Sequence, residues 1–122
     1  SIGGPHEIDA DYLRQLKNLA DRVQPRWVAD HLCWSRGSAH QLHDLLPLPF
    51  TQESLLHVAS RVRLVQDILQ RPLVLENVSA YVQWKTSCMS ESQFLAELSS
   101  LTGCEILLDV QFGFVVRTEV FR

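Results

Sequence analysis

Three short apolar runs, each following a stretch of helical periodicity, constrain the fold of this chain more than any other feature. The runs lie within residues 27–29, 73–75 and 105–110, and the helical stretches are residues 9–24, 51–69 and 90–103. No hairpin turn separates neighbouring elements, so helix and strand alternate as they do in parallel α/β proteins. Apolar runs without polar alternation also indicate strands that are covered on both faces.

The fold class predicted from this order is α/β, with about three consecutive β/α units and parallel strands in a partial (β/α)8 TIM-type barrel. A closed barrel of this type needs about 250 residues, whereas this chain has 122. We therefore expect residues 1–122 to form a single incomplete barrel segment.

Capping residues mark where the three helices begin. Asp9 and Thr51 precede two of them, and Ser90 with Gln93 forms a capping box in which each side chain satisfies a backbone amide. Gly103 is placed to end the third helix. The residues expected on the buried helix faces are Tyr12, Leu13, Leu16, Leu19, Ala20, Val23, Leu55, Val58, Ala59, Val62, Val65, Leu69, Phe94, Leu95, Leu98 and Leu101.

Composition and charge exclude several classes of partner. The chain is 46% hydrophobic and 20% charged, which is typical of a folded globular protein. Its net charge of -3 and its lack of basic runs argue against nucleic-acid binding. Since no stretch is apolar enough for a membrane helix and the first residues do not resemble a signal peptide, we expect a cytoplasmic protein.

The chain has three cysteines, Cys33, Cys88 and Cys104. Their odd number and wide spacing fit neither a disulfide framework nor a zinc knuckle. We expect all three to be reduced and to pack as small apolar groups.

Polar, metal-capable side chains end each predicted strand: Asp30 and His31, then Glu76 and Asn77, then Asp109. In a barrel of this type the carboxyl ends of the strands line one pocket, so these side chains are expected to converge. Two carboxylates and an imidazole suit iron, manganese or zinc. Caps or loop hydrogen-bond acceptors explain the same residues equally well on pattern alone.

Residues 35–50 contain a glycine and two prolines, which predict a long loop, and loops of that length are often functional. His40 and His43 lie in it, and His43 beside Asp44 is interpreted as a hydrogen-bonding wall of the pocket. The chain has no nucleophile elbow, phosphate loop or dinucleotide motif.

Five segments together resemble the multinuclear non-haem iron-dependent oxidative enzymes, whose best-known type acts in methanobactin biosynthesis. They occur in the family's order and spacing over nearly the whole chain. The segments are Ser1-Ile2-Gly3-Gly4, Asp30-His31-Leu32-Cys33-Trp34-Ser35, His43-Asp44-Leu45-Leu46-Pro47-Leu48-Pro49-Phe50-Thr51, Leu75-Glu76-Asn77-Val78-Ser79-Ala80-Tyr81 and Gly103-Cys104-Glu105-Ile106-Leu107-Leu108-Asp109-Val110.

The resemblance implies a TIM-type barrel that holds two or three iron ions and uses O2 to modify cysteine residues of a ribosomally made precursor peptide. It also implies a small partner protein that delivers the peptide. His31, Glu76 and Asp109 match family metal-ligand positions, with Glu76 in the place of a bridging carboxylate. Asp30 and His43 match motif positions without an assigned role, as does Asn77.

The chain departs from the family pattern at both ends. It begins just after the family's first ligand histidine, ends before the later ligands, and its tail, residues 111–122, leaves the pattern. We therefore expect a truncated, recombined or frameshifted product that carries about half of a site and is inactive in isolation.

Two other readings stay open. A divalent-metal barrel of the isomerase or phosphoesterase type has the same fold and similar ligands. Alternatively, the chain is a non-catalytic fragment that self-associates through the sheet edges of an unclosed barrel.

Overall fold

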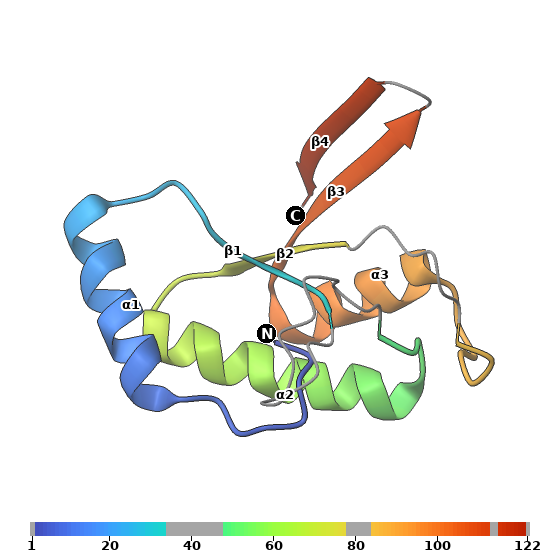
Figure 1. Cartoon of the computed structure of the whole chain (residues 1–122), viewed down its shortest axis with the longest axis horizontal. Coiled ribbons are helices and arrows are strands. Elements are labelled where there is room, and N and C mark those ends of the chain that lie inside the picture. Colours follow the sequence, from blue (N-terminus) through green and yellow to red (C-terminus); the bar gives the residue numbers. More distant parts are fainter. Residues whose placement is uncertain (1, 34–47, 78–83, 113–114, 122) are drawn as a thin grey trace, which may run out of the picture.

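The computed structural model describes residues 2–33, 48–77, 84–112 and 115–121, which form three helices and a four-stranded sheet (Figure 1). The elements in chain order are α1 (Ala10–Val23), β1 (Val28–His31), α2 (Gln52–Leu69), β2 (Leu73–Glu76), α3 (Glu91–Thr102), β3 (Glu105–Phe112) and β4 (Val115–Phe121).

The first three strands confirm the predicted fold class. The pairs β1–β2 and β2–β3 are parallel, and each crossover between them contains a helix. Helices α2 and α3 lie on one face of this sheet (Figure 1). The arrangement is an open α/β sheet, consistent with a partial TIM-type barrel.

The fourth strand contradicts the expectation that no hairpin interrupts the helix–strand alternation. β3 runs to Phe112, and β4 returns antiparallel beside it. Together they form a ribbon that projects from the rest of the molecule (Figure 1). The tail 115–121 is rich in β-branched residues, which favour a strand.

The core between the sheet and the helices follows the predicted periodicity. All six predicted residues of α2, spaced from Leu55 to Leu69, are no more than 5% exposed. The α3 residues Phe94, Leu95 and Leu98 are also buried, but Leu101 is 41% exposed, so its predicted burial was wrong. Thr51 and the Ser90–Gln93 capping box begin these helices as predicted.

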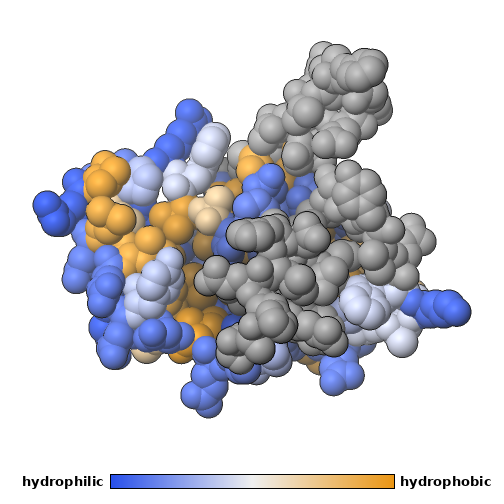
Figure 2. All heavy atoms as spheres, in the orientation of Figure 1, coloured by the Kyte–Doolittle hydropathy of each residue, from blue (hydrophilic) through white to orange (hydrophobic). Residues whose placement is uncertain are grey.

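Helix α1 buries less of its apolar face than its sequence predicts. Asp9 caps it as expected, accepting hydrogen bonds from the amides of Asp11 and Tyr12. Leu13 and Ala20 are buried, yet the rest of the stripe is largely exposed, and Figure 2 shows apolar surface over this region. In the described part of the chain α1 packs mainly on α2, so only one side of its stripe is covered. The exposed residues are Tyr12, Leu19 and Val23.

The three cysteines form no disulfide in the structure, and they do not share one environment. Cys33 and Cys104 are each 1% exposed and pack as apolar groups, and burial raises the pKa of the Cys104 thiol. Cys88 is exposed, because it lies in the turn before α3, where its sulfur approaches the carbonyl oxygen of Phe50 at 3.6 Å. The prediction that all three are packed was therefore wrong for Cys88.

Arg61 of α2 anchors the N-terminal segment to the body of the protein. Its Nε donates to the carbonyl oxygen of Ile2 and its Nη1 to that of His6, both at 2.6 Å. Partial burial lowers the pKa of Arg61, but a guanidinium stays charged at neutral pH. These bonds hold the segment against the residues that follow β1.

Gly3 lies where this segment passes closest to the chain after β1. A Cβ at this position would lie 2.6 Å from the carbonyl oxygen of Cys33 and 2.8 Å from Leu48 Cδ2. The backbone oxygen cannot move aside without shifting the end of β1. A side chain is therefore excluded by space, and no phosphate-binding role is needed to explain this glycine.

We expect Gly3→Ala to lower the free energy of unfolding by about 1–3 kcal/mol, because the added methyl overpacks this contact. Urea denaturation is the measurement. Ser100→Ala on the exposed face of α3 is the control, with an expected change within about 0.5 kcal/mol. Equal effects of the two substitutions would contradict the close approach at Gly3.

No helix in the described ranges is both long enough and apolar enough to cross a bilayer.

Candidate functional site

The sheet separates its side chains into a helix-facing set and an opposite set. Leu75 and Ile106 belong to the core with α2 and α3, so the positions that alternate with them lie on the other face. On that other face His31 is in register with Glu76, and Glu76 with Leu107. Two of the predicted ligands therefore share one row at the carboxyl ends of neighbouring strands.

His31 and Glu76 meet within this row, and we call them the strand-end pair. The Nε2 atom of His31 lies 3.2 Å from Oε2 of Glu76. The side chains are 47% and 26% exposed, so solvent reaches the pair. An imidazole nitrogen and a carboxylate oxygen at this distance form a hydrogen bond or ion pair as they stand, and they are also donors for a transition metal.

The backbone around the strand-end pair is fixed by the sheet ladder. The carbonyl oxygen of Glu76 accepts a hydrogen bond from the amide of Leu32 at 2.9 Å. The amide of Asn77 donates one to the carbonyl oxygen of Leu107 at 3.3 Å. After His31 the chain enters the core at once, because Leu32 and Cys33 are 5% and 1% exposed. Both side chains thus project from backbone that is held on either side.

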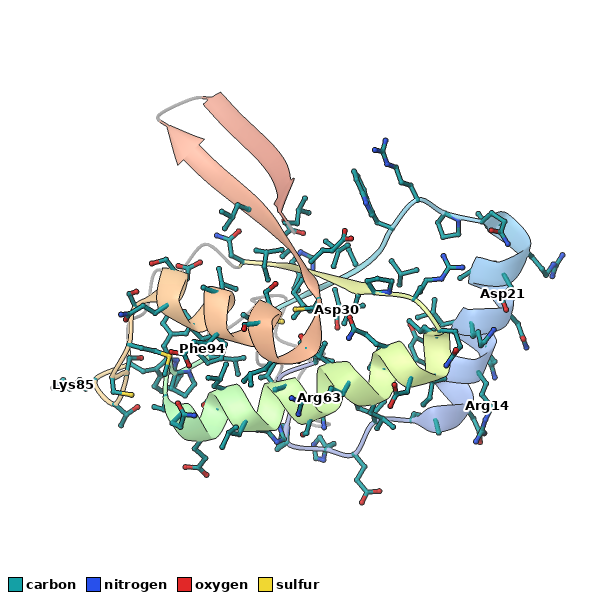
Figure 3. The ribbon with its side chains drawn as sticks, turned by 180° about the vertical axis from the view of Figure 1, so that it is seen from behind. Arg14, Asp21, Asp30, Arg63, Lys85 and Phe94 are labelled. Atoms are coloured by element: carbon teal, nitrogen blue, oxygen red, sulfur yellow. The ribbon has the colours of Figure 1, made fainter. Side chains whose placement is uncertain are left out.

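Asp30 does not join the strand-end pair. It is in register with Leu75, so it lies on the helix-facing side of the sheet, where Figure 3 labels it near α2. Its Oδ1 accepts from the amide of His31 at 2.8 Å. Asp30 therefore acts on His31 through the backbone, and its carboxylate faces a different space.

That space is a cavity of about 490 Å³ between α1, α2 and β1. It is lined largely by apolar residues such as Leu16 and Val65, with Asp30 and Arg61 among its polar groups. Neither member of the strand-end pair lines it, so this cavity and the candidate metal ligands are separate features.

The other predicted site residues are placed in part. Asn77 directly follows β2 and is partly buried. The backbone of Asp109 lies in β3, two residues beyond Leu107, and is in register with Thr118 of β4. His43 lies outside the described residues. Within those residues, no group of three or more His, Cys, Asp or Glu side chains comes close enough to hold a metal ion.

Sequence reasoning missed Glu105. Its Cα is in register with Val74, two residues before Glu76, so it lies on the same face of the sheet as the strand-end pair. It is 9% exposed. The sequence could have revealed this position, because side chains two residues apart in a strand lie on the same face, as Glu105 and Leu107 do.

Comparisons with known proteins agree with the family resemblance described in the sequence analysis. A family model described as "RiPP precursor modification enzyme MbnB/TglH/ChrH" matches residues 1–119. A UPF0276 protein of Caulobacter vibrioides is 51% identical over 115 residues, which cover 94% of this chain and 41% of that protein. UPF0276 proteins of an Anaeromyxobacter species and of Rhizobium meliloti are 46% and 44% identical, with 41% and 38% of their lengths covered. The chain spans about two fifths of these relatives.

Proposed function

Because this chain belongs to the MbnB/TglH/ChrH family of RiPP precursor modification enzymes, we propose that its strand-end residues supply part of an iron site. In the whole protein this site would oxidise cysteine residues of a ribosomally made precursor peptide with O2. The family match confirms the resemblance found in the sequence, and it supports a peptide substrate.

The observation that carries the proposal is the contact of His31 with Glu76. Ligands at about 2.1 Å from one metal and at right angles to each other lie about 3 Å apart, and the pair is separated by 3.2 Å. Imidazole and carboxylate together form the donor set that non-haem iron takes in oxygen-using enzymes. The residues that are present therefore fit an iron ion.

Asp109 is the proposed third ligand. Its backbone lies in the strand next to Glu76, toward the carboxyl end of the sheet. The remaining ligands, including those of a second or third iron ion, would be residues of the whole protein outside these 122. In this proposal Glu76 would hold metal through its carboxylate, Asn77 would lie beside the site, and Asp30 would orient the His31 backbone.

The chain's own contribution to the reaction is geometric. Bound iron would supply the redox chemistry between O2 and the substrate thiol. The ladder bonds on both sides of Glu76 hold its backbone, as the turn after His31 holds that of His31. From these positions the imidazole and the carboxylate lie 3.2 Å apart. Partial exposure of both side chains leaves room for a peptide thiol to approach from solvent.

The family match favours peptide modification over an isomerase or phosphoesterase, although the pair alone would also suit manganese or zinc. A small protein that delivers the peptide remains part of the proposal.

The test uses a whole protein that contains this segment, with Fe2+, O2 and a cysteine-containing precursor peptide. We expect a mass change that is confined to cysteine residues and blocked when they are alkylated first. Full turnover with Mn2+ or Zn2+ in the absence of O2 would overturn the proposal.

A further inference from the structure

The outer edge of β4 is a long strand edge without a neighbour in the described part of the chain. β4 is the last strand in the sheet order and pairs only with β3 there. It has seven residues, from Val115 to Phe121, and its ribbon stands away from the helices (Figure 1). Such an edge offers a row of backbone donors and acceptors to another strand.

The register of the ribbon places two residues of opposite charge across from apolar residues of β3. Arg117 is in register with Val110 of β3, and Glu119 with Leu108. Neither charged residue therefore has a charge at the directly opposite position of the strand beside it. A strand on the outer edge could provide one.

The sequence of β4 is complementary to itself about Thr118. If two copies pair antiparallel with Thr118 at the centre, position 117 of one copy faces position 119 of the other. This register puts Arg117 opposite Glu119 of the second copy, twice in each pair of strands. It also puts Val116 opposite Val120, and pairs of β-branched residues stabilise neighbouring strands.

We propose that β4 binds β4 of a second copy of this chain, which joins the two sheets into one across a twofold axis at Thr118. Antiparallel pairing over β4 would add about one backbone hydrogen bond per residue. This proposal is independent of the iron site.

The other free edge of the sheet is a weaker candidate for the same contact. β1 has four residues, Val28–His31, and its only charged or titratable residues are Asp30 and His31 side by side. An antiparallel register of β1 centred between Asp30 and His31 would place these two residues across from each other twice, but it would pair only two residues of the strand. Charge complementarity therefore selects β4, and a second copy as its occupant.

Charge reversal tests the register directly. Sedimentation velocity over a concentration series should show a dimer, and Arg117→Glu or Glu119→Arg should each weaken it by about tenfold, because like charges then face each other. The double variant Arg117→Glu/Glu119→Arg should restore the original dissociation constant. Lys85→Glu, exposed and distant from β4, is the matched control and should change nothing.

A second measurement does not depend on affinity. In a Cys88→Ser background, Thr118→Cys should form a disulfide between copies under mild oxidation, whereas Cys at Ser100 should not. The proposal is overturned if the chain stays monomeric at every concentration. It is also overturned if the chain forms a dimer but the double variant weakens that dimer as much as each single reversal does. A monomer that instead binds an extended peptide at β4 overturns it in favour of strand addition by a peptide.

Discussion

Replacing Phe94 by alanine is expected to lower the free energy of unfolding by about 3–5 kcal/mol. Phe94 is 0% exposed and lies between α3 and the rest of the core (Figure 3). Its ring centre is 5.1 Å from that of Phe50, so the substitution removes an aromatic pair and leaves a cavity. Since small domains are stable by only about 5–15 kcal/mol, this loss is a large share of the total.

Urea denaturation followed by circular dichroism measures the effect. Phe94→Leu keeps most of the side-chain volume and should lower the free energy of unfolding by less, about 1–2 kcal/mol. This variant can therefore be measured even if the alanine variant does not fold. Leu101→Ala, on the exposed side of the same helix, should cost under about 0.5 kcal/mol. Equal losses at Phe94 and Leu101 would contradict the position of the core.

Replacing Glu76 by glutamine is expected to weaken Fe2+ binding at least about tenfold. The change keeps the size of the side chain but removes the charge that faces His31. Even groups that only support metal ligands typically change affinity by about 10–100-fold, so loss of a ligand's charge should reach that range. Anaerobic calorimetric titration with Fe2+ of a whole protein that contains this segment is the measurement.

Glu97→Gln is the matched control, because it makes the same change in charge on the exposed side of α3. It should bind Fe2+ as the original chain does. Identical affinities for Glu76→Gln and the original chain would remove Glu76 from the site.

The sequence was most informative where one local pattern determines burial. In α2 a regular spacing from Leu55 to Leu69 and a capping Thr51 predicted both the helix and its buried face. In α1 the same kind of pattern predicted the helix, but its prediction that Leu19 is buried was wrong, because Leu19 is 55% exposed. Periodicity identifies which residues share a face, and it does not tell whether another element covers that face.

The tail was predicted only to leave the family pattern, and no strand was predicted in it. Its run of β-branched residues favours a strand. Pairing with β3 from Phe112 back to Ile106 decided the outcome. Register of this kind depends on long-range contacts, so the sequence alone did not reveal it.

The strand ends were predicted as a group, but their division between two faces was not. Alternation along β1 puts Asp30 and His31 on opposite sides of the sheet, and only the register with β2 shows that His31 meets Glu76. The same register reveals Glu105 beneath the pair. The role of Asp109 as a ligand stays a prediction.

Anomalous diffraction at the iron edge, from crystals of a whole protein that contains this segment, grown anaerobically with saturating Fe2+, tests the proposed site most directly. We predict a peak within bonding distance of Nε2 of His31 and a carboxylate oxygen of Glu76. Iron bound only elsewhere, or no iron peak at the strand-end pair under these conditions, would contradict the proposal.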